Sequence, residues 1–274
     1  PAWPPIWVEG DGVSNVDRVL EGAIDIHVHI APDPLVERRA GAIEVARQAQ
    51  ELGMQGLVLK SHQYPTHPVA YTVSELVPHL TLIGGIVLDV EVGGLNSTAV
   101  EATAQMGGRV VWMPTYSAQA DRQHEGLSGG ICLLDERGKL LPEVRETLGL
   151  VKSHDMVLAT GHVSTKECMV LVEEARNQGI RRVVVTHGTT SAFWTGMTAA
   201  DMKDMAEMGA YVEHCLHVMI PTTYRLSPQD LVETHQDYRA GELHRKQRLQ
   251  PRLSSHARGG HADGHRHFAA GRPG

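Results

Sequence analysis

The residues best suited to chemistry stand in the segment Asp25-Ile26-His27-Val28-His29. Residues two apart on a β-strand point to the same side, so His27 and His29 would face inward while Ile26 and Val28 pack outward. Two imidazoles at this spacing can converge on one metal ion. The alternative is a pair of polar residues on a half-exposed strand. It fits less well, because the strand is apolar and buried unpaired imidazoles are costly. The pair therefore predicts a metal site.

Two further histidines follow apolar runs. His162 comes after residues 157–161, and His187 comes directly after residues 183–186. Active residues of barrels built from βα units project from the carboxyl ends of the strands. A single histidine at a strand end is more often an ordinary hydrogen-bonding residue, but several such histidines together form a specific pattern. We therefore predict that His162 and His187 join His27 and His29 at one site.

The elements that must position these residues are short apolar strands alternating with helices, the pattern of a parallel sheet. We predict strands over residues 22–30, 56–60, 81–88, 109–113, 156–160, 181–186 and 210–213. Helices are predicted over residues 37–52, 97–106, 164–178 and 198–208, with a capping box between Ser164 and Glu167. A hairpin is expected within residues 117–141. This order predicts an α/β fold, a TIM-like (β/α)8 barrel with seven strand–helix units in register and the eighth missing or disordered.

The chain divides by composition into three parts. Residues 1–21 form an N-terminal extension, residues 22–234 the barrel, and residues 235–274 an aberrant or disordered basic tail. The tail has three interpretations: a natural basic tail, a vector-derived extension, or translation in a shifted frame. We favour the last, because the alternative frame permits an eighth strand with an aspartate across the codons of Arg248 and Leu249.

Composition excludes several function classes. The net charge of −7 gives no reason to bind nucleic acid, and no apolar run is long enough for a membrane span. Three widely spaced cysteines argue for a reducing compartment. We expect a cytoplasmic protein that acts on a small molecule, without a nucleic-acid or membrane partner, and homo-oligomerisation stays open.

The histidine pattern resembles the amidohydrolase superfamily of metal-dependent hydrolases over residues 22–214. The resemblance implies that His27, His29 and His162 are metal ligands. It makes His187 either a further ligand or the group that polarises the substrate carbonyl. The superfamily's aspartate at the end of the eighth strand has no counterpart in register here. Its lysine or glutamate of binuclear members is also missing from the fourth strand end, residues 111–114. We therefore expect one divalent ion, zinc, rather than two.

Two groups beyond the ligands are candidates for contact with substrate. Lys60 ends the second strand and would be a carboxylated bridge, a neutral base or a partner for a substrate carboxylate; a lysine that merely extends to solvent is the alternative. His62 follows two residues later, and we assign both residues to the catalytic group with His187. Glu213 and His214 end the seventh strand, where an acid either reaches the site or is simply solvated.

The expected reaction is hydrolysis of a C–N or C–O bond in an amide, ester or lactone by metal-activated water. Metal-dependent, non-oxidative decarboxylation is a second hypothesis, which release of CO₂ without net consumption of water would identify. A third is an inactive barrel that lacks the aspartate of the eighth strand and has exposed strand edges.

Overall fold

The computed structural model describes residues 19–191 and 195–216, together with residues 227, 229, 232–234 and 236. All of them belong to the same unit of the chain, residues 1–241. The predicted tail after residue 234 and the proposed eighth strand lie outside the described residues, apart from residue 236. The same holds for all but the last three residues of the predicted N-terminal extension.

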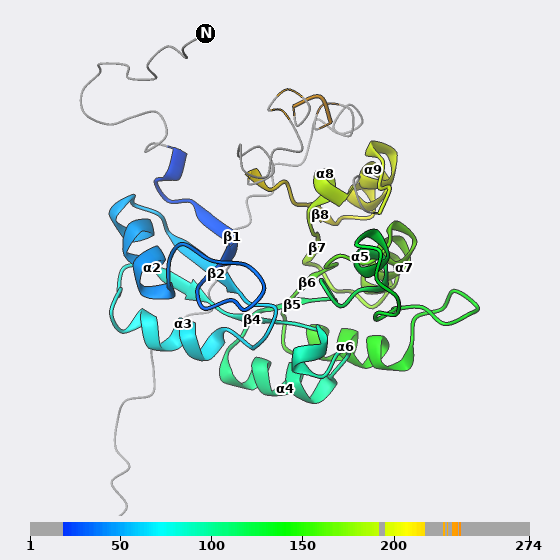
Figure 1. Cartoon of the computed structure of the whole chain (residues 1–274), viewed down its shortest axis with the longest axis horizontal. Helices are drawn as coiled ribbons and strands as arrows, with labels where there is room; N and C mark the ends of the chain where they lie inside the picture. The colour runs from blue at the N-terminus through cyan, green and yellow to red at the C-terminus, as the bar shows by residue number, and fades with distance from the viewer. Residues whose placement is uncertain are drawn as a thin grey trace, which may run out of the picture. The chain divides into compact units, whose positions relative to one another are not determined.

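The strands form two parallel sheets among the described residues. The first has the order β1 (Ile24–His29), β2 (Gly56–Lys60) and β3 (Thr81–Ile83). The second has the order β4 (Gly85–Val87), β5 (Val110–Trp112), β6 (Val157–Ala159), β7 (Val183–Val185) and β8 (Tyr211–Val212). Helices follow the strands along the chain (Figure 1). The fold is therefore the predicted α/β arrangement of parallel strands in the style of a TIM barrel.

The third predicted strand, residues 81–88, is divided between the two sheets at Gly84. A Cβ atom at Gly84 would overlap the backbone of Thr66 and His67, so only glycine allows the chain to pass there. Thr66 takes over the hydrogen bonds at the break: its N–H donates to the Gly85 carbonyl, and its hydroxyl accepts from the Gly85 N–H, both at 2.9 Å. The seven predicted strand segments thus appear as eight short strands in the described chain.

The four predicted helices are present as α2 (Ala42–Glu51), α4 (Ser97–Met106), α7 (Thr165–Asn177) and α9 (Ala199–Glu207). The first begins at Ala42 rather than residue 37, because the chain before it is held extended: Ala31 N–H donates to Ala40 O at 2.9 Å. The capping box of Ser164 and Glu167 is confirmed. The described chain also contains helices that were not predicted, namely α3 (His67–Ser74), η1 (Val90–Val92), α5 (Gln119–His124), α6 (Pro142–Ser153) and α8 (Gly188–Ser191).

The predicted hairpin lies within the insertion before α6. Leu134 and Leu140 form an antiparallel bridge, and Asp135 N–H donates to Lys139 O at 2.8 Å. The Glu167 carboxylate of the capping box also accepts from Leu133 N–H at 2.7 Å. One buried acid therefore fastens both the start of α7 and the hairpin.

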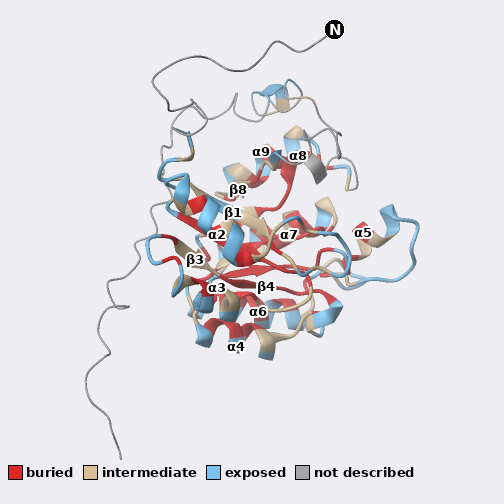
Figure 2. Ribbon diagram, turned by 60° about the vertical axis from the view of Figure 1, so that its left-hand side comes forward, coloured by how far each residue is buried: buried red, intermediate tan, exposed pale blue. Residues whose placement is uncertain are grey.

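The core follows the alternation of side chains along the strands. On β2, Leu57 and Leu59 pack outward among helix residues, whereas Val58 joins an inner cluster with residues of β4, β5 and β6. Figure 2 shows burial concentrated on the strands and on the helix faces that cover them. Lys60 stands two residues after Val58 on the same strand, so its side chain points inward as well. Among the described helices, none combines the length and apolar character needed to cross a membrane.

Strand β1 departs from expectation at one position. Val28 packs outward as predicted, but Ile26 is 40% exposed. The pairing of β1 with β2 shifts register between Asp25 and Val28, so the regular alternation of the strand is interrupted around Ile26. The inward direction of His27 and His29 is unaffected, as their mutual contact shows.

Candidate functional site

The chemistry-bearing residues gather at the carboxyl ends of the strands. His27 and His29 come from β1, and Lys60 is the last residue of β2. The segments after the other strands contribute further side chains, namely Asp89, His162, His187, Glu213 and Cys215. In barrels of this type the carboxyl ends of the strands carry the active residues.

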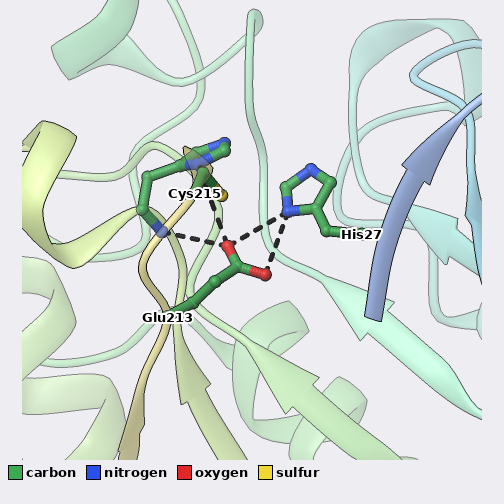
Figure 3. A group of neighbouring side chains, drawn as sticks. His27, Glu213 and Cys215 are labelled. Atoms are coloured by element: carbon green, nitrogen blue, oxygen red, sulfur yellow. Dashed lines mark hydrogen bonds and ion pairs between the residues drawn. The ribbon is translucent and has the colours of Figure 1, made fainter. Parts of the chain in front are cut away.

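His27 lies at the centre of the group. Its Nδ1 is 3.0 and 3.1 Å from the two oxygens of Glu213 (Figure 3). A carboxylate only accepts, so Nδ1 carries the proton and Nε2 keeps its lone pair. That Nε2 lies 3.2 Å from His29 Nε2 and 3.0 Å from Lys60 Nζ. Glu213 therefore sets the tautomer that leaves Nε2 of His27 available as a donor to an ion.

His187 is held in an uncommon backbone conformation, with φ of 54° in the left-handed region. Such a residue costs about 1–3 kcal/mol and persists where its surroundings require it. Its N–H donates to Glu213 at 3.1 Å, and its Nδ1 is 3.0 Å from Cys215 Sγ. The ring lies 4.7 Å from that of His27, measured between centroids. Backbone and ring contacts together bring β7 and β8 residues to β1.

His162 reaches the same region through Gly161, whose φ is +66°. A Cβ at Gly161 would overlap the carbonyls of Met113 and Pro114, so the close passage of the two loops requires glycine. The ring of His162 lies 5.3 Å from that of His187 between centroids, and its Nδ1 is 3.5 Å from Asp121 Oδ1.

Lys60 is 1% exposed, which makes the alternative of a lysine extending to solvent wrong. Its Nζ lies 5.4 Å from the centre of the Trp112 ring, a cation–π contact. Burial lowers the pKa of Lys60 to about 8, although the carboxylates of Glu213 and Asp89 act in the opposite direction. The ammonium thus loses its proton more readily than an exposed lysine does.

His62 belongs to a buried network that the sequence reading did not foresee. Its Nδ1 lies 2.6 Å from Thr115 Oγ1 and 3.3 Å from Asp89 Oδ2. Asp89 is fully buried and also accepts from the N–H groups of Thr115 and Ser117, at 2.7 and 3.0 Å, and from the Thr115 hydroxyl. Burial alone would raise the pKa of Asp89, but the hydrogen bonds from His62 and Thr115 lower it overall. Because Nδ1 of His62 is bound to Asp89 and Thr115, Nε2 of the same ring points away from these two residues.

The ring of His62 packs against the other candidate residues. It stacks on His29 with centroids 4.8 Å apart and lies 4.2 Å from the ring of Tyr116. Burial lowers the pKa of His62 to about 4, against the opposing effect of Asp89. Burial likewise lowers the pKa of His29 and His187 well below the usual value. These imidazoles are therefore neutral at physiological pH, the form that binds metal.

The donors that lie closest together differ in part from the predicted ligands. Within the described residues, one set has ligand atoms that all lie within 4.8 Å of one another: His27, His187, Glu213 and Cys215. His29 and His162 contact this set through His27 and His187 but are not part of it. Burial raises the pKa of the Cys215 thiol, and Glu213 adds to the effect.

The residues that sequence reasoning missed carried weak signals. Asp89 follows an apolar strand directly, and Thr115 stands just after another, which are the positions that supplied the histidines. Cys215 stands two residues after Glu213, a spacing that places both on one side of an extended segment. A search of every strand end for acids, hydroxyls and thiols, rather than for histidine alone, would have found them.

A separate cavity of about 240 Å³ lies at the opposite end of the sheet, before β6 and β7. Its lining includes Lys152, Asp155 and Arg181. The amino ends of barrel strands serve stability rather than catalysis. The histidine cluster, not this cavity, is the candidate functional site.

Comparison with solved structures finds low similarity to enzymes. A deoxyribose phosphate aldolase from Aeropyrum pernix shares 17% identity over 72% of this chain and 77% of its own, with a TM-score of 0.39. A putative deoxyribose-phosphate aldolase from Coccidioides immitis shares 13% over 81% and 91%, with a TM-score of 0.40. Dihydropteroate synthase from Thermus thermophilus shares 13% over 74% and 91%, with a TM-score of 0.31. Likeness at this level carries no argument about function.

No curated protein matches the chain. The model of DUF6282, a family of unknown function, matches residues 22–213, and the chain belongs to this family.

Proposed function

We propose that this protein is a metal-dependent hydrolase of the amidohydrolase type, which cleaves a C–N or C–O bond in a small molecule. The observation that carries the proposal is the pair of ring nitrogens of His27 and His29, 3.2 Å apart. Zinc bonded tetrahedrally to two imidazoles at about 2.0–2.1 Å places their nitrogens roughly 3.3 Å apart. The pair therefore has the separation that one ion needs.

The protonation of the cluster also fits a cation. Burial keeps the rings of His29 and His187 neutral, and Glu213 holds the proton of His27 on Nδ1. A carboxylate behind a histidine in this way orients the ring and raises its basicity toward metal. We assign the ion to His27, His29, His162 and His187, with zinc as the expected metal. Such an ion supplies hydroxide near neutral pH and polarises a carbonyl oxygen.

The chain's own residues then bind substrate and handle protons. The Lys60 ammonium, buried against Trp112, is placed to hold a substrate carboxylate or a carbonyl oxygen that gains negative charge. His62, fixed through Nδ1 by Asp89 and Thr115, is placed to accept or donate a proton at Nε2. Glu213 is the acid nearest to the proposed ligands. It would take the part of the superfamily's aspartate, which binds metal and takes a proton from the attacking water.

A substrate screen tests the proposal. The 274-residue chain, loaded with Zn(II), is offered amides, esters and lactones in heavy-oxygen water. Hydrolysis places the heavy oxygen in the product, and His27→Ala is expected to reduce turnover by at least 100-fold, a loss of about 2.7 kcal/mol in transition-state stabilisation. His124→Ala is the control, because His124 is exposed on α5.

The other outcomes are informative. Release of CO₂ without uptake of heavy oxygen would replace the proposal with decarboxylation. Stoichiometric zinc without turnover of any of these classes would favour the inactive barrel. Zinc content that is unchanged in His27→Ala would contradict a metal centre at these histidines.

A further inference from the structure

We propose that Cys215 and Glu213 are themselves metal ligands, so that the ion is held by a thiolate and a carboxylate together with His27 and His187. This inference rests on the proposed function, because it takes a metal centre at His27 and His187 as given, and it places Glu213 and Cys215 in the ligand set in place of His29 and His162. It also names the chemical class of the ion, a thiophilic divalent metal such as zinc rather than magnesium or calcium.

The four proposed donors lie close together. The ligand atoms of His27, His187, Glu213 and Cys215 all lie within 4.8 Å of one another. Cys215 Sγ lies 3.0 Å from His187 Nδ1, and Glu213 lies 3.8 Å from the same nitrogen. Figure 3 shows Glu213 between His27 and Cys215. In this ligand set His27 binds through Nδ1, which faces Glu213, and not through Nε2. Its ring proton then moves to Nε2, and Glu213 gives its lone pairs to the ion.

The backbone holds these donors in place. Glu213 N–H donates to Val185 O at 3.0 Å and Glu213 O accepts from Gly188 N–H at 2.9 Å, which continues the pairing of β7 with β8 past the strand ends. A Cβ at Gly188 would overlap the side chain of Val212, so glycine permits this close approach. His187 stands between Val185 and Gly188, the two residues that bond to Glu213, and has the left-handed φ described above. Main-chain bonds thus hold Glu213 and the turn that carries His187 in place before any ion binds.

The charges around Lys60 also favour a thiolate and a carboxylate as ligands. A divalent ion beside the Lys60 ammonium would bring three positive charges into a buried region. Glu213, Asp89 and Cys215 are the acidic groups that act on Lys60 there, and as two carboxylates and a thiolate they carry three negative charges. A ligand set made only of neutral imidazoles would leave more positive charge uncompensated, and a buried charge without a partner is costly.

Binding of the ion to Cys215 releases the proton of the thiol. As the ion forms a bond to Cys215 Sγ, the S–H bond breaks and its proton passes to solvent water. Thiolate, imidazole and carboxylate together suit zinc, whereas magnesium and calcium prefer oxygen ligands. The competing explanation is a hydrogen-bonded group of thiol, imidazole and carboxylate that binds no ion. It predicts that added Co(II) forms no bond to a thiolate.

Cobalt(II) substitution provides the test. The 274-residue chain is treated with a chelator to remove bound metal and is then loaded with Co(II). Its absorption spectrum and its metal content after desalting are measured. A thiolate ligand gives an intense near-ultraviolet charge-transfer band that imidazole and carboxylate ligands do not give. We expect this band in the wild-type protein, its loss in Cys215→Ser, and a Co(II) affinity at least about tenfold weaker in that variant. Cys132→Ser is the matched control, because Cys132 is also a half-buried free cysteine.

The outcomes separate this inference from the proposed function. Stoichiometric Co(II) with visible absorption but no charge-transfer band in wild type would overturn thiolate ligation and leave the metal centre standing. A band that persists in Cys215→Ser, or disappears in Cys132→Ser, would overturn the assignment to Cys215. No retained Co(II) in wild type would overturn the metal centre and the thiolate together. The wild-type spectrum decides the first and last cases even if Cys215→Ser fails to fold.

Discussion

Asp89 and Glu213 are both buried acids that follow strands at the same end of the sheet, yet their surroundings differ. Asp89 accepts hydrogen bonds from two backbone N–H groups, a threonine hydroxyl and an imidazole. Glu213 meets one backbone N–H and one imidazole, beside a second imidazole, a thiol and the Lys60 ammonium. The first acid is satisfied by the protein itself, whereas the second stands among groups that a cation would bring together. Two acids in equivalent positions thus have different tasks.

The largest effect expected from this comparison is on stability. Asp89→Asn replaces a carboxylate with an amide whose NH₂ group must face donors, so some of them lose their partner. We expect the free energy of unfolding of the metal-free protein to fall by about 3–5 kcal/mol, measured by urea denaturation. Asp204→Asn, an exposed acid on α9, is the control and should change stability by less than about 0.5 kcal/mol. A loss below about 1 kcal/mol in Asp89→Asn would contradict the idea that Asp89 is tightly satisfied.

Metal addition separates the two acids more directly. Zn(II) at a hundredfold excess over its dissociation constant should raise the free energy of unfolding of the wild-type protein by about 2.7 kcal/mol. His187→Ala should largely abolish this increase, because it removes a proposed ligand, whereas Asp89→Asn should retain it despite its lower starting stability. Thermal and urea unfolding with and without zinc provide the measurement. An equal loss in both variants would end the distinction between the two acids.

Much of the fold could be predicted from the sequence because its strands are apolar and short and most of its longer helices are strongly patterned. The twelve-residue α6 was nevertheless missed, although it has a buried face. The break at Gly84 could not, since it depends on the backbone of Thr66 and His67, which are distant along the chain. Short helices such as α5 escaped because six residues carry too little periodicity to be told from a loop. The division of strand three is thus a tertiary effect.

The site shows the same limit. Histidine spacing was enough to select His27 and His29, because the alternation of a strand decides their common face. Nothing in the spacing connects Asp89 with His62, which lie 27 residues apart and meet only through the fold. Cys215 was set aside as one of three scattered cysteines, since its position beside His187 depends on the pairing of β7 with β8. The gathering of histidines at the strand ends was predictable, whereas the contacts of Asp89 with His62 and of Cys215 with His187 were not.

A smaller effect is expected for the second acid without metal. Glu213→Gln keeps one side-chain oxygen that can accept from His27 Nδ1 or from the His187 N–H, so only part of the present bonding is lost. We expect the free energy of unfolding of the metal-free protein to fall by about 1–2 kcal/mol, less than for Asp89→Asn. The stabilisation by zinc should shrink in the same variant. Urea denaturation of the two variants side by side checks the order, and the reverse order would contradict the comparison.

The pH dependence of stability sharpens the comparison at the Asp89 network. Burial lowers the pKa of His62 from 6.5 to about 4 in the folded protein. Between these values the unfolded chain binds a proton that the folded chain does not. The free energy of unfolding therefore rises with pH across this window: the stabilisation is complete above about 6.5 and is lost as the pH falls toward 4.

His62→Gln removes this proton, so the rise of stability between pH 4 and 6.5 should become shallower by at most about 1.4 kcal/mol per pH unit. Urea denaturation of the metal-free protein at several pH values measures the slope, with His79→Gln as a control at an exposed position. The slope is the readout because a general loss of packing lowers stability at every pH, whereas only the loss of a titrating group changes its pH dependence. An unchanged slope in His62→Gln would mean that folding leaves the pKa of His62 near 6.5, so that the folded and unfolded chains bind the same number of protons at this residue. That result would contradict the lowering of the His62 pKa by burial.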